Sequence, residues 1–235
     1  MKKAYFITGT DTNVGKTLVA CALLHKFVES GVHAVGMKPV AAGVDVEVNA
    51  EDPTTRESNN EDVRLLRASS NVTVAPELDN PFLLQEAMAP HIAAHREGKQ
   101  IDIEHIAACF DQLRAQADVV IIEGAGGFLV PLNDTQDSGD LAVRLGTPVI
   151  LVVGMRLGCL NHALLSQEAI LARGLRLAGW VANHIDPTMI GVKENVETLK
   201  QRMKAPMLGF IPYQSGSDEE SSEDMPDIPT LLSLP

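Results

Sequence analysis

The residues best suited to chemistry form a loop near the amino terminus, Gly9-Thr10-Asp11-Thr12-Asn13-Val14-Gly15-Lys16-Thr17. An apolar run precedes this loop and apolar residues at helical spacing follow it, which is the setting of a phosphate-binding P-loop. In such a loop, backbone N–H groups and the positive end of the helix hold phosphate oxygens, and Lys16 would add a charge near the transferred phosphoryl group. The hydroxyl of Thr17 would bind Mg²⁺. The loop therefore predicts an enzyme that uses ATP and magnesium.

The spacing of this loop departs from the usual P-loop pattern, because five residues rather than four separate Gly9 from Gly15. A plain strand-to-helix turn with an exposed lysine is the alternative explanation. The flanking strand and helix favour a variant P-loop over that turn. A dinucleotide-binding fingerprint fits less well, because Gly-x-Gly-x-x-Gly is absent after this strand.

A carboxylate comes at the expected end of a second apolar run, where Glu123 follows residues 118–122 and precedes Gly124-Ala125-Gly126-Gly127. Ligands of open α/β sheets bind at the carboxyl ends of the strands. Small residues after Glu123 would also let the backbone approach a ligand. Glu123 is therefore a candidate Mg²⁺ ligand beside Thr17, and a solvated acidic residue in a glycine turn is the weaker alternative.

Lys38 stands in a similar place, directly after an apolar run and before Pro39. A cation there would face the phosphates, although an exposed lysine before a proline turn explains the residues alone slightly better. Glu61 and Asp62 begin a predicted helix, where the helix dipole favours acidic side chains. Residue types alone do not choose between these two acids as a metal ligand.

Two further stretches are ambiguous. Residues 157–162 follow an apolar run and open a predicted helix, so their amides could hold an anion, and a helix cap by Asn161 is an equally good explanation. His91 and His95 lie four residues apart, but Ile92 replaces the glutamate of a His-Glu-x-x-His zinc site. We assign both histidines mainly to structure.

These candidates must be positioned by alternating strands and helices. Short Val/Ile-rich runs alternate with segments of helical periodicity, which indicates successive βαβ units. The predicted strands are residues 4–9, 33–38, 118–123, 148–154, 176–183 and 207–210, and the predicted helices are residues 15–30, 60–68, 103–116, 140–145, 161–173 and 192–203. We expect an α/β protein with a mostly parallel β-sheet flanked by helices on both faces.

Length and composition narrow the class of protein. With 235 residues, 45% of them hydrophobic, we expect a single domain over residues 1–235. A net charge of -12 without a Lys/Arg-rich run argues against nucleic acid and anionic membranes as partners. No apolar run is long enough to span a membrane, and three scattered cysteines predict reduced thiols in a cytoplasmic protein. Residues 42–60 and the acidic residues 215–227 are expected to be solvated, the second segment mobile.

Five motifs in this order closely resemble the dethiobiotin synthetase family: TGTDTNVGKT (8–17), GMKPVA (36–41), EGAGG (123–127), VGMRLGCLNH (153–162) and GWVAN (179–183). The longer glycine loop belongs to that family's pattern. The resemblance implies a P-loop NTPase fold, a homodimer and a cyclo-ligase of biotin biosynthesis. Such an enzyme uses ATP to join CO2 to 7,8-diaminononanoate through a carbamate and a carbamic-phosphoric anhydride, giving dethiobiotin, ADP and phosphate.

The resemblance also implies a set of site residues. Thr17, Asp62 and Glu123 would hold Mg²⁺, and Lys38 and Lys16 would be catalytic. ATP would contact Asn13, Val14, Gly15, Lys16, Thr17, Leu18, Asp62, Glu123, Gly124, Ala125, Gly126, Asn183, Pro212, Tyr213, Gln214 and Glu219. The diamine substrate would contact Thr12, Lys38, Ala42, Gly158, Cys159, Leu160 and Asn161, the last four contributed by the partner subunit. Ala42 stands where many relatives carry a serine, so that hydroxyl contact is missing.

Two other classes compete with this interpretation. A partitioning-type P-loop ATPase, which dimerises on ATP as a switch, would carry an extra lysine near the start of its loop, whereas Lys16 is the only lysine between Lys3 and Lys26. A glutamine-dependent ligase of cobyrinate type would need a further amidotransferase domain, which we do not expect in a chain of this length.

Overall fold

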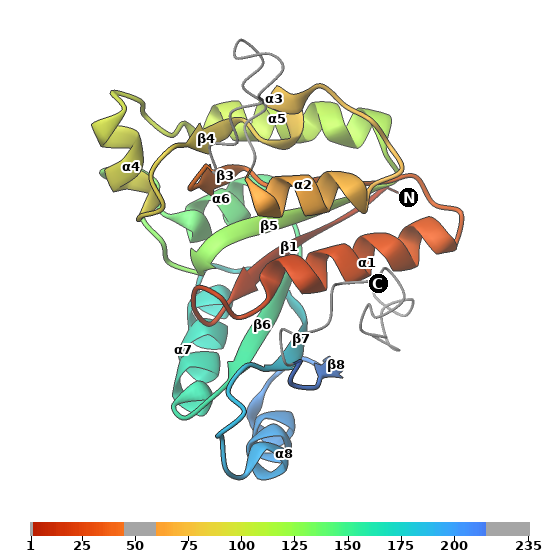
Figure 1. The fold of residues 1–235 in the computed structure, drawn as a ribbon, viewed down its shortest axis with the longest axis vertical. Helices are drawn as coiled ribbons and strands as arrows, with labels where there is room; N and C mark the ends of the chain where they lie inside the picture. The colour runs from red at the N-terminus through yellow and green to blue at the C-terminus, as the bar shows by residue number, and fades with distance from the viewer. Residues whose placement is uncertain (1, 45–59, 215–235) are drawn as a thin grey trace, which may run out of the picture.

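The computed structural model describes residues 2–44 and 60–214. Its centre is a six-stranded sheet in the order β2-β5-β1-β6-β7-β8, and each neighbouring pair of strands is parallel. The strands are β1 (Lys3–Gly9), β2 (Ala34–Met37), β5 (Val119–Gly127), β6 (Val149–Met155), β7 (Leu177–His184) and β8 (Met207–Ile211). Because they are all parallel, their carboxyl ends meet at one edge of the sheet (Figure 1).

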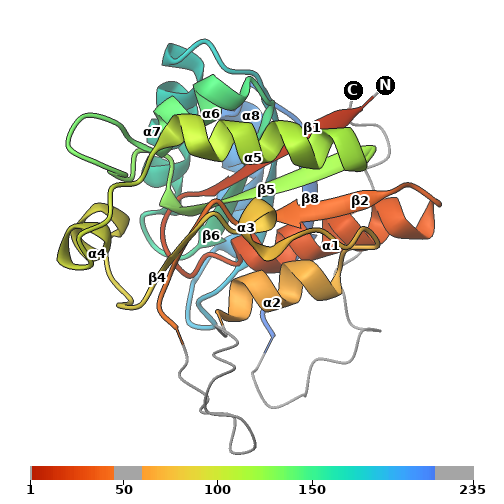
Figure 2. The ribbon, with the colours of Figure 1, turned by 90° about the horizontal axis from the view of Figure 1, so that it is seen from above.

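Helices cover both faces of this sheet. α1 (Lys16–Glu29) and α2 (Glu61–Ala68) lie on one side, and α5 (Ile103–Gln116), α6 (Ser138–Leu145), α7 (Cys159–Ala172) and α8 (Val192–Arg202) lie on the other (Figure 2). The alternation of side chains along a strand accounts for both layers. In β1, Tyr5 and Ile7 join the buried cluster beneath α1, whereas Phe6 joins the cluster of the opposite face.

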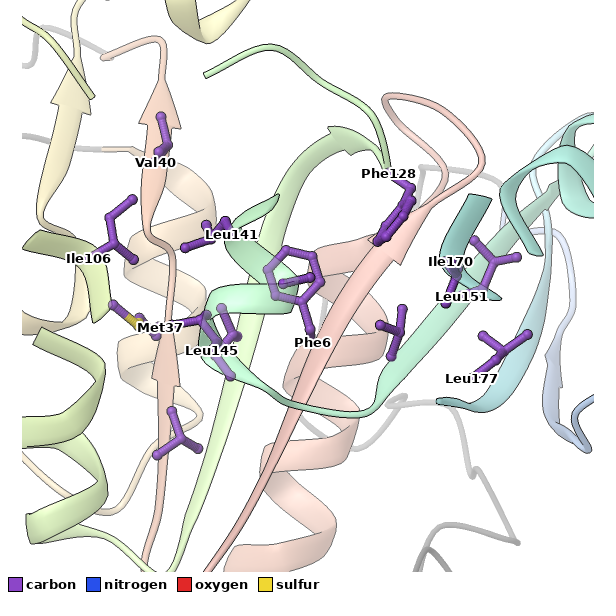
Figure 3. Packing of buried hydrophobic residues seen from close by; sticks show 14 of the residues in the cluster. Phe6, Met37, Val40, Ile106, Phe128, Leu141, Leu145, Leu151, Ile170 and Leu177 are labelled. Carbon is purple, nitrogen blue, oxygen red and sulfur yellow. The ribbon is translucent and has the colours of Figure 1, made fainter. Parts of the chain in front are cut away.

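The larger core lies on the face that carries α5 to α8. Figure 3 shows Phe6, Met37 and Leu151 of the sheet beside Leu141 of α6 and Ile170 of α7. All five side chains are at most 2% exposed. The apolar runs of the sequence are therefore buried on both faces, as a parallel sheet requires.

A small second sheet was not predicted. β3 (Val40–Ala42) pairs in parallel with β4 (Phe82–Leu84), and the short helices α3 (Pro76–Asp79) and α4 (Pro90–Arg96) lie nearby in the chain. Each of these elements has only three to seven residues, too few for a periodic pattern. Both helices begin at proline, which is tolerated in a first turn because its missing N–H needs no partner there.

The structure confirms the predicted fold class and all six predicted strands, and it corrects two local predictions. β5 continues to Gly127, so Glu123 lies inside a strand rather than at its end. Helix α7 begins at Cys159 after a Gly158 cap with φ 97°, so Asn161 lies within the first turn and is not the cap. Division into a single domain stays a prediction, and residues 215–227 and most of 42–60 lie outside the described residues.

Candidate active site

The phosphate-loop candidate joins β1 to α1 at the carboxyl edge of the sheet (Figure 1). Its backbone takes two left-handed conformations, at Asn13 with φ 58° and at Gly15 with φ 86°. A Cβ atom on Gly15 would lie 2.2 Å from Nδ2 of Asn183 and would force that side chain to shift, and the positive φ itself favours glycine there. Nδ2 of Asn183 also donates to the Val14 carbonyl oxygen at 2.9 Å. The loop is therefore held in shape by a side chain from β7.

The same loop is tied to β6, a link that was not predicted. The Thr10 amide donates to the Val152 carbonyl at 2.9 Å, and the Gly154 amide donates to Oγ1 of Thr10 at 3.2 Å. Arg156, just beyond β6, forms an ion pair with Asp11. These last two residues are 145 positions apart, so no local pattern in the sequence could reveal their contact.

Lys16 folds back over the loop, where its ammonium nitrogen donates to the Asp11 carbonyl at 3.1 Å. The side chain is buried although it carries a charge. Burial lowers the pKa of Lys16, and the nearby charge of Lys38 lowers it further. A bound phosphate would reverse this penalty by placing negative charge beside the two ammonium groups.

Four predicted residues meet in one network. The Lys38 ammonium nitrogen lies 2.7 Å from Oδ2 of Asp62 and 2.6 Å from Oε1 of Glu123. Oγ1 of Thr17 lies 2.7 Å from Oδ1 of Asp62 and 3.0 Å from Oε1 of Glu123. The three residues predicted to hold magnesium and the predicted catalytic lysine are thus in direct contact.

Strand register explains why Lys38 and Glu123 meet. Met37 of β2 is opposite Ile122 of β5, so the next residues along the two chains lie side by side. Asp62 reaches them from the first turn of α2, where the Asn60 side chain caps the helix by accepting from the Val63 amide at 3.2 Å. Asp62 rather than Glu61 therefore joins the site, a choice that residue types alone left open.

The network shifts the pKa values of its members. Burial alone would lower the pKa of Lys38, but the charges of Glu123 and Asp62 raise it above its ordinary value. Burial acts to raise the pKa of Asp62, yet the charge of Lys38 and hydrogen bonds from Lys38 and Thr17 lower it overall. Burial raises the pKa of Glu123, and Lys38 opposes that rise.

The donor set suits a hard divalent cation such as Mg²⁺. It consists of a hydroxyl and two carboxylates, and magnesium prefers one or two protein carboxylates together with phosphates and waters. Oε2 of Glu123 is buried and has no hydrogen-bond partner among the described residues, so a lone pair of this carboxylate is left without a donor or a cation. No group of three or more His, Cys, Asp or Glu side chains placed to hold a metal is found in residues 2–44 and 60–214, and the structural role of His91 and His95 stays a prediction.

The other predicted ATP contacts lie on several elements. Asn183, which bonds to Val14 of the phosphate loop, is opposite Ile211 in the sheet, and the exposed residues Pro212, Tyr213 and Gln214 follow Ile211. The Tyr213 ring also packs edge-on against His184, with ring centroids 5.9 Å apart. Among the remaining predicted contacts, Leu18 lies on α1, and Gly124, Ala125 and Gly126 lie in the last part of β5. Glu219 is outside the described residues.

The predicted substrate residues fall into two groups. Thr12 is exposed in the phosphate loop, and Ala42 ends β3, four residues after Lys38. Gly158, Cys159, Leu160 and Asn161 begin α7. The Cys159 thiol is buried, and its amide donates to the Arg156 carbonyl at 3.0 Å.

Comparison with known proteins identifies the family. A model of an AAA domain matches residues 3–221. ATP-dependent dethiobiotin synthetase BioD of Aromatoleum aromaticum is 55% identical over 216 residues, which cover 92% of this chain and 93% of the relative. The protein of the same name from Nitrosospira multiformis is 53% identical over 228 residues, which cover 97% of this chain and 96% of the relative.

Solved structures agree on the fold alone. A ParA family ATPase from Chlorobium tepidum has a TM-score of 0.55 at 13% identity, covering 100% of this chain and 90% of that chain. The septum site-determining protein MinD of Pyrococcus horikoshii, complexed with Mg-ADP, has a TM-score of 0.51 at 17% identity, covering 91% and 82%. Because the sequence relatives match nearly end to end at more than half identity, this chain belongs to the ATP-dependent dethiobiotin synthetase family.

Proposed function

We propose that this chain joins CO2 to 7,8-diaminononanoate at the expense of ATP and closes the ureido ring of dethiobiotin, releasing ADP and phosphate. The observation that carries the proposal is the convergence of two buried lysines, Lys16 and Lys38, beside one phosphate loop. A partitioning-type switch ATPase would take its second lysine from the start of the phosphate loop, whereas Lys38 directly follows β2. A carboxylating enzyme must hold a second anion, the carbamate, against the phosphates of the nucleotide.

The reaction brings two anions together, the carbamate and the γ-phosphate, and the two lysines would supply the positive charge that reduces their repulsion. A carbamate oxygen attacks the γ-phosphorus and ADP leaves, which forms the mixed anhydride; the second amine then attacks the carbonyl carbon, loses a proton and expels phosphate. Lys16, held by the loop, would lie against the phosphate oxygens. Lys38 would bridge the carbamate and the transferred phosphoryl group, where fixed positive charge lowers the barrier.

Thr17, Asp62 and Glu123 are proposed to hold Mg²⁺, which when bound neutralises phosphate charge and aligns the nucleotide. Their oxygen donors and the unpartnered Oε2 of Glu123 support this assignment. The rest of the proposed ATP site follows the family pattern, with the adenine against Asn183 and residues 212–214. The Asn183 amide group already donates to the loop, and its oxygen remains to accept from the base.

We further propose a cytoplasmic homodimer whose substrate carboxylate is held by Gly158, Cys159, Leu160 and Asn161 of the partner. Two exposed leucines support a protein contact at this end of the molecule: Leu157, beside that turn, is 94% exposed and Leu165 of α7 is 61% exposed. Cys21, Cys109 and Cys159 are buried, and no disulfide forms among the described residues, which fits a reducing compartment.

Phosphate release tests the proposed function. Purified protein is assayed with ATP, MgCl2, bicarbonate-derived CO2 and the diamine, and then with each component omitted in turn. We expect phosphate release only with all four components. Steady hydrolysis of ATP without diamine and CO2 would support the switch ATPase instead.

A further inference from the structure

Lys38 occupies a position that a reacting lysine would have to leave. Its ammonium group lies between Asp62 and Glu123, at 2.7 Å and 2.6 Å, and is only 5% exposed. Both contacts are with side chains of the protein itself and not with a substrate. With both contacts made, the ammonium charge is directed toward the protein and not toward a carbamate or a phosphate.

The proposed magnesium ligands are the same side chains. Lys38 contacts one oxygen of each carboxylate, Oδ2 of Asp62 and Oε1 of Glu123. An ammonium ion at contact distance and a divalent cation on the same two carboxylates would repel each other. We therefore expect binding of the metal to weaken the contacts of Lys38.

The backbone around Lys38 is fixed, so an exchange would involve its side chain alone. The Lys38 amide donates to the Asp79 carbonyl at 2.8 Å, and the Lys38 carbonyl accepts from Nδ2 of Asn80 at 2.7 Å. Asp79 is itself held by two hydrogen bonds from Arg67, at 2.7 Å and 2.5 Å. Rotation about the four side-chain bonds of the lysine would move the ammonium group while its anchor stays in place.

We propose that Lys38 is an internal counterion of the two carboxylates that would hold the metal, and that arrival of the metal with ATP displaces its ammonium group toward the reacting anions. This inference rests on the proposed metal ligands and deepens the proposed function. The lysine stabilises two buried carboxylates before substrates bind and stabilises the transferred phosphoryl group afterwards. The catalytic charge is thus delivered only when the nucleotide and its metal are present.

Binding of Mn²⁺ without nucleotide, measured by electron paramagnetic resonance, tests this exchange. Lys38→Met removes the counterion, whereas Lys16→Met is the matched control, because it removes a nearby charge that does not touch either carboxylate. We expect Lys38→Met to bind Mn²⁺ at least about tenfold more tightly than the wild type, and Lys16→Met to change the affinity by less than about threefold. Equal gains in the two variants would overturn the inference, because they would reflect net charge alone.

A measurement on the wild type covers the case in which Lys38→Met does not fold. The ¹⁵N signal of the Lys38 ammonium group is followed by NMR while Mg²⁺ and ADP are added together. We expect a clear shift of that signal as its carboxylate contacts are lost, and an unchanged signal at saturation would overturn the inference. If Mn²⁺ fails to bind the wild type even with an ATP analogue, the proposed metal site itself is wrong. Normal binding with the analogue but no gain in Lys38→Met refutes only the counterion role.

Discussion

The ammonium nitrogen of Lys38 lies 2.6 Å from a carboxylate oxygen of Glu123, and the two side chains are 5% and 1% exposed. Removal of Lys38 alone would leave the Glu123 carboxylate buried without a counterion and should be strongly destabilising, whereas replacement of both residues by apolar side chains should cost less. This relationship links stability to catalysis, since the same two groups are proposed to act on ATP and its metal.

Removal of one partner should therefore destabilise the fold strongly. We expect Lys38→Met to lower the free energy of unfolding by about 3–5 kcal/mol, measured by urea denaturation, because it leaves the buried Glu123 carboxylate without a counterion. The double variant Lys38→Met, Glu123→Leu should lose less than Lys38→Met alone, because the buried carboxylate is removed as well. A double variant that is less stable than the single variant would contradict this view of the pair.

Gly15→Ala should abolish ATP binding, because an added Cβ would meet Asn183 at 2.2 Å in a backbone conformation with φ 86°. Gly31→Ala is a matched control, since Gly31 has φ 77° and no atom within 4 Å of its added Cβ. We expect the control to cost about 1 kcal/mol of stability from backbone strain and to bind ATP normally. Calorimetric titration with ATP distinguishes the two variants, and tight binding by Gly15→Ala would show that the loop is not held as described.

The ion pair between Arg156 and Asp11 should support the loop modestly. Both side chains are more than one third exposed, so solvent screening limits their coupling to about 1 kcal/mol or less. We expect Arg156→Ala and Asp11→Asn each to weaken ATP binding several-fold, and the double variant to be no worse than the sum of the two. Arg144→Ala breaks a comparable pair with Glu104 away from the site and should leave ATP affinity unchanged. Equal losses of ATP affinity in Arg144→Ala and Arg156→Ala would show that Arg156 does not position the loop.

The stability contributed by Asp62 should depend on pH. Its pKa in the folded protein is lowered, so the contribution is present above the unfolded value of about 3.9 and is lost as pH falls through the folded pKa. The difference in unfolding free energy between the wild type and Asp62→Asn should be constant near neutral pH and shrink in acid. Denaturation curves recorded from neutral to acidic pH measure this difference in unfolding free energy. A difference that grows in acid would contradict a lowered pKa of Asp62.

Much of the fold was predictable because its signals are local. Each strand of the main sheet is a short Val/Ile-rich run, and α1, α5 and α8 have the length and periodicity of helices. The small sheet and the two short helices lack such patterns. β3 and β4 pair across 42 positions of chain, as in the pairing of Val40 with Phe82, so tertiary contact rather than local preference selects these strands.

The site was predictable in its parts but not in its connections. The loop, Lys38 and Glu123 each stand next to an apolar run, and the family pattern supplied Asp62. Nothing in the sequence indicated that Lys38 lies against both carboxylates or that Asn183 bonds to Val14. These contacts depend on strand register and on segments far apart in the chain, which side-chain types alone do not specify.

The most direct test of the central claim is the fate of labelled carbon. Protein is incubated with ATP, magnesium, the diamine and ¹³C-labelled bicarbonate, and phosphate and product are quantified in the same samples by colorimetry and mass spectrometry. We predict one labelled carbon in the dethiobiotin ring for each phosphate released, and neither product from Lys38→Ala although that variant still binds ATP. Phosphate release without incorporation of label, or unchanged turnover in Lys38→Ala, would contradict the account.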